Sequence, residues 1–510
     1  SYLVDDVVRR VGCVVACYRT PVVEVIVPEQ AARTYDGVAP DDAADIVRDC
    51  FRPRGLVRRA RAAASRLLAP LVEGGSPSSV RTLRSEVRDP HVTAFLAGQV
   101  HIATEGWGEL DPLDFEQTVA LGGFQALRRV LAERQPDAVI DEVDRAGLRG
   151  RGGGGFPTAR KWRLARDAAG DHKTVICNGD EGDPGAFMDR MILESFPFRV
   201  IEGLTLAAYA VGARDGIFYV REEYPLAYER IQAAIETARE QGLLGADLLG
   251  SGFDFDVRIV KGAGAFVCGE ETALIASLEG RRGMPVLRPP FPVESGLEGR
   301  PTIVNNVETL ALLPWILRHG ADAFAAHGTE RSRGTKVFSL AGKVARGGLI
   351  EVPMGITIRE VVEEIGGGVP DGDFKAVQVG GPSGGCIPAA LADTPIDYEA
   401  LVSKGAMMGS GGLVVLGSND CMVDMARYFL QFTQNESCGK CTLCRLGTRQ
   451  MLDLLERICR GRGRRRDLDD LEALARTTAA GSLCGLGHAA PNPVLTTHRY
   501  FRDEYEAHLE

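Results

Sequence analysis

The chain has 510 residues, more than one hydrophobic core usually holds, so we expect three or four domains. A hydrophobic content of 45% and a charged content of 25% are ordinary for a globular protein, and a formal net charge of −10 argues against nucleic acid as the main partner. No apolar run is long enough to span a bilayer, so direct membrane insertion is not expected.

The cysteine content of 12 residues is far below that of a disulfide scaffold. The acidic, amphipathic start of the chain is not typical of a signal peptide, and because it lacks Met we expect a processed or incomplete N-terminus. Clustered cysteines in such a chain more often bind metal than form disulfides. We therefore expect a reducing, cytoplasmic location.

Five segments follow one another along the chain. Residues 1–70 alternate β-rich and helical patterns, and residues 71–110, which include EGGSPSS, predict a linker. Residues 111–335 alternate helical stretches with short apolar runs such as KTVICNGDE and GIFYVRE, which predicts an α/β domain. Residues 336–415 predict a small α+β domain around the helix TIREVVEEIGG, and the helical periodicity of residues 416–510 predicts a bundle.

A glycine-rich loop, AGLRGRGGGGFPTARKW, matches the pattern G-x-G-x-x-G from Gly150 onward. A dinucleotide fingerprint should follow a strand, whereas DAVIDEVDRAGL before the loop predicts a helix, so we reject the ordinary Rossmann interpretation. The loop still has the features of a phosphate site, because Pro157 can begin a helix whose N-terminus faces an anion, and Arg151, Arg160 and Lys161 add positive charge. A flexible surface loop is the competing interpretation.

Two acidic turns come later in the chain. CNGDEGDPGAFMDR places Asp180, Glu181 and Asp183 in one turn, and GAGAFVCGEETAL leads into a helix with Glu270 and Glu271 at its start. Acidic residues at a helix start favour the helix dipole, so capping alone could explain the second pair. Both sets also resemble groups that hydrogen-bond ribitol, ribose or nicotinamide. Calcium is an alternative for the first turn, although its ligand order does not match an EF-hand.

Near the C-terminus, ESCGKCTLCRLGT places Cys438, Cys441 and Cys444 at three-residue steps after a predicted helix. Cubane iron–sulfur clusters take four thiolates. Cys459 lies within a helical pattern and is expected to be buried, whereas Cys484 lies in the glycine-rich stretch SLCGLGHAAPNP. We assign Cys484 as the fourth ligand of a [4Fe–4S] cluster. Zinc and plain structural cysteines are the alternatives.

Together these motifs resemble the NADH-binding flavoprotein subunit of respiratory complex I and its relatives, the diaphorase subunits of NAD-dependent formate dehydrogenases and of NAD-reducing or electron-bifurcating hydrogenases. YVREEYP, PTIVNNVETL and MMGSGGLVV also match, and GDPGAFMDR is nearer the hydrogenase and formate dehydrogenase branch. The resemblance implies an α/β fold: a modified Rossmann-like FMN domain over residues 111–335, a ubiquitin-like β-grasp (SLBB) domain over 336–415, and a cubane-binding helical bundle over 416–510.

The resemblance also implies the site residues. The implied FMN contacts are Gly150, Arg151, Gly152, Lys161, Asn178, Asp180, Glu181, Gly269, Glu270, Asn305, Asn306 and Thr309. For NADH, Phe156 and Phe291 are the implied adenine-stacking aromatics, and Glu271 is an acid on the nicotinamide side. Glu271 and Asp183 would tune the affinity for NAD(H). The candidate catalytic residues are Glu181 and Glu271.

Two places depart from the family pattern. Leu164 stands where many relatives have an aromatic residue, so we expect an adenine stack that is one ring short. Residues 1–70 resemble the second half of a thioredoxin-like [2Fe–2S] domain, which needs two cysteine pairs, but only Cys13 and Cys17 are present. Because two thiolates leave a cluster half-ligated, we expect this [2Fe–2S] site to be unoccupied.

The implied reaction is hydride transfer between NADH and FMN, followed by single-electron transfer to the cubane and then to partner subunits. Partners must supply the other half-reaction, and we expect a thioredoxin-like [2Fe–2S] subunit and a catalytic formate dehydrogenase or hydrogenase subunit. A complex I subunit, a non-catalytic iron–sulfur scaffold and a zinc-stabilised interaction module are the alternatives. The sequence does not decide between NAD and NADP, and it does not show whether electron bifurcation occurs.

Overall fold

The computed structural model describes residues 98–170 and 172–510, together with short pieces at 22–25, 33–36, 38–43, 46–47, 81–84 and residue 95. The chain divides into two compact units. One contains residues 98–510, and the described part of the other lies within residues 14–97.

The smaller unit contains three short antiparallel strands in the order β1-β2-β3. They are β1 (Val22–Val25), β2 (Arg33–Asp36) and β3 (Arg81–Arg84). β3 lies in the segment that the sequence predicts to be a linker. The predicted [2Fe–2S] ligands Cys13 and Cys17 lie outside the described residues, as does most of the predicted thioredoxin-like segment.

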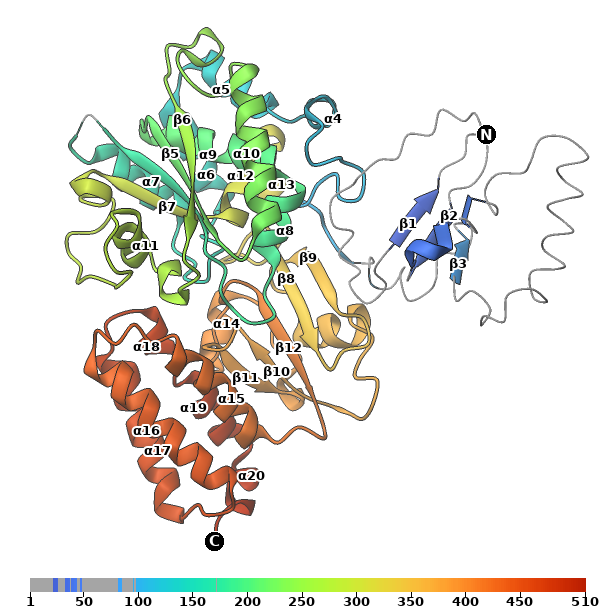
Figure 1. Ribbon diagram of the computed structural model, residues 1–510, viewed down its shortest axis with the longest axis vertical. Coiled ribbons are helices and arrows are strands. Elements are labelled where there is room, and N and C mark those ends of the chain that lie inside the picture. Colours follow the sequence, from blue (N-terminus) through green and yellow to red (C-terminus); the bar gives the residue numbers. More distant parts are fainter. Residues whose placement is uncertain are drawn as a thin grey trace, which may run out of the picture. The chain divides into compact units, whose positions relative to one another are not determined.

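Four parallel strands form the centre of the first large domain (Figure 1). They are β4 (Thr174–Gly179), β5 (Asp215–Arg221), β6 (Asp256–Gly262) and β7 (Thr302–Asn306). Consecutive residues of a strand point to opposite faces, so the burial of Val175, Ile176 and Cys177 means that both faces of β4 are covered. The sheet order is β6-β5-β4-β7, so the direction of strand addition reverses between β4 and β7. In open parallel sheets, ligands bind beyond the carboxyl ends of the strands at such a point.

Ten helices of this domain surround and extend the sheet within the described residues. They are α4 (Phe115–Ala120), α5 (Gln125–Glu133), α6 (Pro136–Ala146), α7 (Thr158–Asp167), α8 (Met188–Ser195), α9 (Pro197–Val211), α10 (Pro225–Glu240), α11 (Glu271–Leu278), α12 (Val307–His319) and α13 (Ala321–Ala325). The backbones of α9 and α12 approach closely, because a Cβ on Gly203 would stand only 2.0 Å from the carbonyl oxygen of Leu310.

The second large domain is a mixed five-stranded sheet in the order β11-β10-β12-β8-β9. Its strands are β8 (Thr335–Gly342), β9 (Gly348–Pro353), β10 (Phe374–Val379), β11 (Gly385–Pro388) and β12 (Gly412–Gly417). β8 and β12 pair in parallel, and the other pairs are antiparallel. The helix predicted from TIREVVEEIGG is a short π-helix over Glu360–Ile365, and α14 (Tyr398–Ser403) follows later.

The C-terminal region is a helical bundle, as the sequence predicts. Its helices are α15 (Met422–Asn435), α16 (Thr442–Cys459), α17 (Arg465–Gly481), α18 (Gly485–Ala489), α19 (Asn492–Tyr500) and α20 (Arg502–Ala507). Leu430, Leu452, Leu471 and Tyr505 are buried in its core. The predicted fold class, an α/β domain followed by a β-grasp domain and a bundle, is confirmed. None of the described helices is both long and apolar enough to cross a bilayer.

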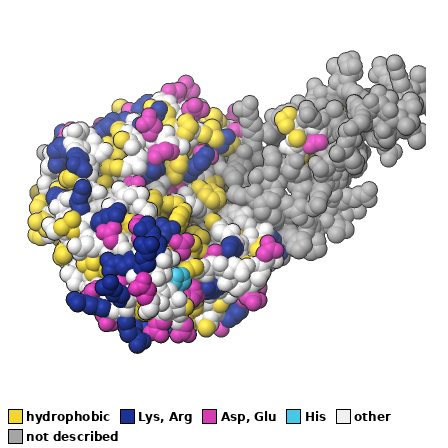
Figure 2. Space-filling model, turned by 60° about the horizontal axis from the view of Figure 1, so that its bottom comes forward, with side chains coloured by type: hydrophobic (Ala, Val, Ile, Leu, Met, Phe, Trp, Pro, Cys, Tyr) yellow, Lys and Arg dark blue, Asp and Glu magenta, His cyan; other side chains and the backbone are white. Residues whose placement is uncertain are grey.

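A basic stretch joins α16 to α17 in the bundle. Its exposed arginines are Arg460, Arg462, Arg464, Arg465 and Arg466. Three of them form ion pairs with acidic side chains of the bundle, at 3.3 to 3.5 Å. Basic and acidic side chains are also interspersed on the face that Figure 2 shows. These features are those of a solvated, ion-paired surface.

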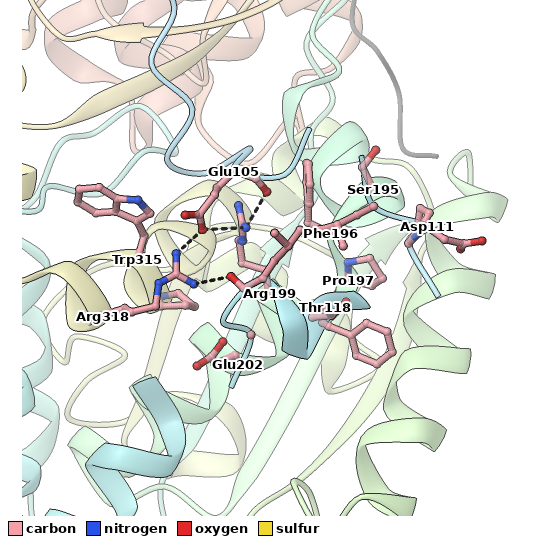
Figure 3. A pocket seen from close by; sticks show the side chains of 16 residues that line it. Glu105, Asp111, Thr118, Ser195, Phe196, Pro197, Arg199, Glu202, Trp315 and Arg318 are labelled. Carbon is pink, nitrogen blue, oxygen red and sulfur yellow. Dashed lines mark hydrogen bonds and ion pairs between the residues drawn. The ribbon is translucent and has the colours of Figure 1, made fainter. Parts of the chain in front are cut away.

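A partly buried ion network fastens the segment before α5 to the sheet domain (Figure 3). The Glu105 carboxylate lies 3.3 Å from Arg199 Nη2 on α9 and also pairs with Arg318 on α12. Glu202 on α9 accepts a hydrogen bond from the backbone N–H of Phe124 at 2.8 Å. These four charged side chains line one pocket. The network satisfies its own charges and thereby fixes the path of the chain into the domain.

Candidate functional site

The glycine-rich loop lies at the carboxyl end of β7, where the strand order reverses. A Cβ on Gly152 would stand 3.1 Å from the Cβ of Asn306. The Gly150 N–H donates to the Phe156 carbonyl at 2.9 Å and closes the loop at its base. Within the described parts of the chain, nothing accepts a hydrogen bond from the backbone N–H groups of glycines 152–155. The loop therefore presents free donors at the start of α7, which is the arrangement of an anion site.

The helices on either side of the loop agree with the sequence prediction. α6, rather than a strand, precedes the loop, and α7 begins at Thr158 directly after Pro157. The rejection of an ordinary Rossmann fingerprint is thus confirmed. Pro157 is suited to this place because its fixed φ starts the helix without using an N–H.

Buried polar atoms without hydrogen-bond partners lie at the start of α7 and at the carboxyl ends of β4 and β5. They are Thr158 Oγ1, both carboxylate oxygens of Asp180 and Arg221 Nη1. Arg221 Nη1 is 3.5 Å from Asp180 Oδ1, which is an ion-pair distance, but the two atoms are not aligned for a hydrogen bond. Burial raises the pKa of Asp180 to about 7, although Arg221 lowers it. Because buried polar groups normally have partners, these atoms fit a polar ligand in the crevice.

The first acidic turn is tied to the second and to the β-grasp domain. Asn178 Nδ2 donates to the Gly269 carbonyl at 2.9 Å, and Asn178 Oδ1 accepts from the Asp180 N–H at 3.0 Å. The Asp183 carboxylate accepts from Ser410 Oγ at 2.9 Å. Burial raises the pKa of Asp183 to about 6, although Ser410 lowers it. The structure thus brings the predicted residues of both turns to one edge of the sheet.

Two of the predicted acids cap helices. Glu181 accepts three backbone hydrogen bonds, at 2.9 to 3.2 Å, from the start of α8, and burial raises its pKa to about 7. Glu270 caps α11 by accepting from the N–H groups of Thr272 and Ala273, each at 3.0 Å. Glu270 therefore has the helix-capping role that the sequence left open as an alternative. A catalytic role for Glu181 stays a prediction, and its carboxylate already has three donors.

The two asparagines at the end of β7 also have protein partners. Asn305 Oδ1 accepts from Trp162 Nε1 at 3.0 Å. Asn306 Oδ1 caps α12, and its Nδ2 donates to Asp189 Oδ2 at 2.6 Å. These side chains fix the end of β7 against α7 and α8, so they shape the crevice in which a ligand would lie.

Arg151 differs from the expectation that its charge reaches a phosphate. The side chain is completely buried and donates to the carbonyls of Arg149, Arg333 and Thr335 at 3.2, 2.6 and 3.0 Å. Its backbone N–H donates to Thr309 Oγ1 at 2.8 Å. Because backbone carbonyls use the guanidinium and Thr309 accepts from the N–H, Arg151 and Thr309 hold the loop itself. A direct contact of either residue with FMN stays a prediction.

Lys161, Glu271 and Arg288 form a charged row beside the crevice. Lys161 Nζ is 3.2 Å from Glu271 Oε2 and donates to a β7 carbonyl at 3.0 Å, and Arg288 Nη1 is 2.8 Å from Glu271 Oε1. Phe156 and Phe291, the predicted adenine-stacking residues, are 45% and 47% exposed. The Arg288 guanidinium lies 5.9 Å from the Phe291 ring, which links the aromatic rim to the charged row.

The four predicted cluster ligands line one pocket. They are Cys438, Cys441, Cys444 and Cys484. Burial, together with the other three thiols, raises the pKa of Cys444 to about 11, although Ser437 lowers it. Burial raises the pKa of the Cys484 thiol, although hydrogen bonds from two backbone N–H groups of α18 lower it. Four thiols around one pocket, with backbone donors near them, fit a compact iron–sulfur core.

The other described cysteines do not line this pocket. Cys459 ends α16 and does not line the pocket, and Cys177, Cys268 and Cys386 are buried elsewhere.

The cysteine pocket and the crevice share the short 3₁₀ turn η4 (Phe266–Gly269). Val267 of this turn lines the cysteine pocket, together with Pro285. Two residues further on, a Cβ on Gly269 would stand 3.4 Å from the carbonyl oxygen of Asp180 in the crevice. The two candidate sites are therefore neighbours, and α18 lies close to the α11 side of the sheet domain (Figure 1).

Comparison with known proteins supports this arrangement. Three family models match the chain: the Nuo51 FMN-binding domain over residues 143–315, the SLBB domain over 337–386, and the NADH-ubiquinone oxidoreductase-F iron–sulfur binding region over 424–508. The chain is 54% identical over 413 residues to the NADP-reducing hydrogenase subunit HndC of Solidesulfovibrio fructosivorans, and the match covers 81% of this chain and 84% of that protein. It belongs to the family of NADH-binding, FMN- and [4Fe–4S]-containing flavoprotein subunits.

Other members of the family are similar over most of the flavoprotein chain. The F 2 component of the NADH-quinone oxidoreductase of Rhizobium meliloti is 46% identical over 390 residues, which cover 76% of this chain and 93% of that protein. A crystal structure of NAD⁺-reducing [NiFe]-hydrogenase in the H₂-reduced state aligns with a TM-score of 0.71 at 36% identity, and covers 90% of this chain and 74% of that one. The resemblance inferred from the motifs is confirmed, as are FMN, NADH and a [4Fe–4S] cluster as cofactors and an NADH-oxidising activity.

Three further residues of the candidate site are not among those predicted from the sequence. Thr158 and Arg221 lie within matching stretches, FPT and YVREEYP, so their position inside those motifs was an available signal. Tyr398 on α14 lies in none of those stretches, yet its hydroxyl donates to the Gly150 carbonyl at 2.8 Å across 248 residues of chain.

Proposed function

We propose that FMN occupies the crevice between the glycine-rich loop and the ends of β4 and β7, that NADH enters over the aromatic rim, and that electrons leave through the cysteine pocket. The observation that carries this proposal is η4, which contributes to both sites within four residues. A short path between the centres is what a converter from two-electron to one-electron chemistry requires.

When bound, FMN accepts a hydride from a nicotinamide and releases electrons singly, and the cluster carries one electron at a time. The residues of the chain bind FMN and the nicotinamide nucleotide and orient them. The free N–H groups of glycines 152–155 and the N-terminus of α7 bind the phosphate. The unpartnered Thr158 hydroxyl and Asp180 carboxylate bind the polar part of the flavin, and Asn178 fixes the backbone of this turn against Gly269.

The charged row orients the nicotinamide nucleotide. Glu271 is held on one side by Lys161 and on the other by Arg288, so its position is fixed before the substrate arrives. Phe156 and Phe291 offer exposed ring faces to adenine. Asp183 lies deeper, and its carboxylate, held by Ser410, adds negative charge that disfavours the electron-rich reduced nucleotide.

The relatives of this chain indicate which partner subunits it binds. HndC and the alpha subunit of hydrogenase HoxS of Cupriavidus necator, 43% identical over 377 residues, are named as subunits of NADP- and NAD-reducing hydrogenases. We therefore place this chain in a hydrogenase-type complex with further iron–sulfur subunits, and a formate dehydrogenase complex stays the second candidate. The free thiols among the described cysteines favour a reducing, cytoplasmic location.

Gly154→Val tests the flavin site directly. A Cβ at Gly154 meets no protein atom within 4 Å, and its φ is not in the left-handed region, so the protein should fold normally. The added side chain instead occupies the mouth of the loop. We expect the purified variant to lose FMN while its iron and labile sulfide stay at wild-type levels. FMN at wild-type occupancy would place the flavin elsewhere.

Cys484→Ser tests the exit for electrons. The variant should lose most of its labile sulfide and its [4Fe–4S] electron paramagnetic resonance signal, yet NADH should still bleach the flavin absorbance under anaerobic conditions. A non-catalytic scaffold predicts no NADH-dependent bleaching in either the wild type or the variant. Unchanged iron content would move the fourth ligand away from Cys484.

A further inference from the structure

The base of the glycine-rich loop is closed by the chain itself. The Gly150 N–H donates to the Phe156 carbonyl at 2.9 Å, and Arg149 Nε donates to the Gly155 carbonyl at 2.7 Å. These two bonds fix the ends of the loop. They leave the orientation of the peptide groups between them unspecified, although those groups carry the donors that would bind the phosphate.

The β-grasp domain supplies the missing constraint through Tyr398. The Tyr398 hydroxyl donates to the Gly150 carbonyl at 2.8 Å. Its ring fills the space beside Gly155, where a Cβ would stand 2.7 Å from the ring carbons. The Arg149 guanidinium lies 4.2 Å from the centre of the same ring and forms a 2.8 Å ion pair with Glu399. Two consecutive residues at the start of α14 thus hold both ends of the loop.

The peptide between Gly150 and Arg151 is consequently held at both its polar groups. Its carbonyl accepts from Tyr398 at 2.8 Å, and its N–H donates to Thr309 Oγ1 at 2.8 Å. Rotating this peptide would break both hydrogen bonds at once. The free N–H groups that follow it therefore point in a direction set before any ligand binds, which is the condition for a preorganised anion site.

We infer that Tyr398 of the β-grasp domain is a positioning residue for the flavin. Its hydroxyl donates a hydrogen bond to the Gly150 carbonyl and thereby orients the phosphate-binding glycines. The inference rests on the proposed flavin site in this loop. It assigns the β-grasp domain a part in cofactor affinity, in addition to joining the sheet domain to the bundle. In Figure 1, α14 lies at the junction of these domains.

The bundle side of α14 offers a matched control. Just after α14, the Lys404 carbonyl accepts a hydrogen bond from the Tyr500 hydroxyl at 3.0 Å. Tyr500→Phe and Tyr398→Phe therefore remove the same chemical group from the same kind of bond, on opposite sides of one short helix. Only the Tyr398 bond reaches the glycine-rich loop.

The experiment compares FMN binding by the two variants. Each full-length variant is stripped of flavin, titrated with FMN by fluorescence quenching, and assayed for labile sulfide to confirm an intact bundle. Tyr398→Phe should weaken FMN binding ~2- to 10-fold, the effect of one lost hydrogen bond, and excess FMN should restore the wild-type rate of NADH oxidation. Tyr500→Phe should bind FMN like the wild type.

Two results would overturn the inference: wild-type FMN affinity in Tyr398→Phe, or an equal loss of affinity in both variants, which would indicate general loosening of the domain. Gly154→Val, measured in the same titration, separates this outcome from a failure of the proposed site. If Gly154→Val loses FMN and Tyr398→Phe does not, the site stands and the role of Tyr398 is wrong. If Gly154→Val binds FMN normally, the site itself is wrong.

Discussion

Replacing Lys336 with Met should destabilise the folded state by about 3–5 kcal/mol, the cost of leaving one partner of a buried ion pair alone. Lys336 on β8 and Glu308 on α12 pair with side chains that are 0% and 1% exposed. Glu308 Oε1 also accepts from the Val337 N–H at 2.8 Å, so the carboxylate cannot turn toward solvent without losing a second bond. Met fills most of the Lys volume, and the loss is therefore electrostatic.

The deficit should depend on pH. Burial raises the pKa of Glu181 to about 7 and also raises the pKa of Asp189 and Glu308, whereas Lys336 lowers all three. A carboxyl whose folded pKa lies above its unfolded value binds more protons when folded, so stability falls as pH rises between the two values. Removing Lys336 widens that interval. The difference between the variant and the wild type should be larger at pH 8 than at pH 6.

The assay is thermal unfolding of the FMN-loaded protein followed by circular dichroism. At about 2–4 °C per kcal/mol for a domain of 150–250 residues, Lys336→Met should lower the Tm by roughly 6 °C or more. Lys343→Met is the matched control, because its 2.7 Å pair with Asp420 is half exposed and should contribute less than about 1 kcal/mol. Equal Tm values for the two variants would refute the reasoning, as would a deficit that grows at low pH.

Two further predictions concern α9 and α7. Burial raises the pKa of Glu202 from its usual 4.5 to about 7, so the stability of the wild type should decline as pH rises through that interval. Glu202→Gln should make this decline smaller when melting temperatures at pH 5 and pH 8 are compared. An unchanged difference would assign the pH dependence to other groups. Leu164, 50% exposed on α7, should stack on adenine when replaced by Tyr, which lowers the KM for NADH about 2- to 10-fold at constant kcat. Leu226→Tyr on α10 is its control, and an equal change in both would contradict a local stack.

The sequence predicted the type of fold and the kinds of ligand because those depend on local patterns. The apolar runs of β4 and β5 and the spacing of Cys438, Cys441 and Cys444 are visible within a few residues of chain. The sequence did not show which polar side chains hydrogen-bond within the fold instead of contacting a ligand. Arg151 donates to the Thr335 carbonyl across 184 residues, and no local pattern distinguishes such a buried donor from a phosphate ligand.

The same limit applies to acidic residues at turns. Glu270 and Glu181 occupy sequence positions equally suited to capping a helix or to contacting a ligand, and only the packed structure separates the two uses. Tyr398 was not predicted at all, because no motif surrounds it in the sequence. It nevertheless reaches the glycine-rich loop from a different domain. Long-range contacts of this kind depend on tertiary packing, which a one-dimensional pattern does not encode.

The turn η4 has a consequence for how this protein can vary. Its four residues give Val267 to the enclosure of the thiols and Gly269 to the floor beside Asp180, with one intervening residue. A mutation that reshapes either enclosure must move the backbone of the other. Flavin retention and iron content are thus expected to change together in variants of this turn, so neither can be altered there without re-examining its counterpart.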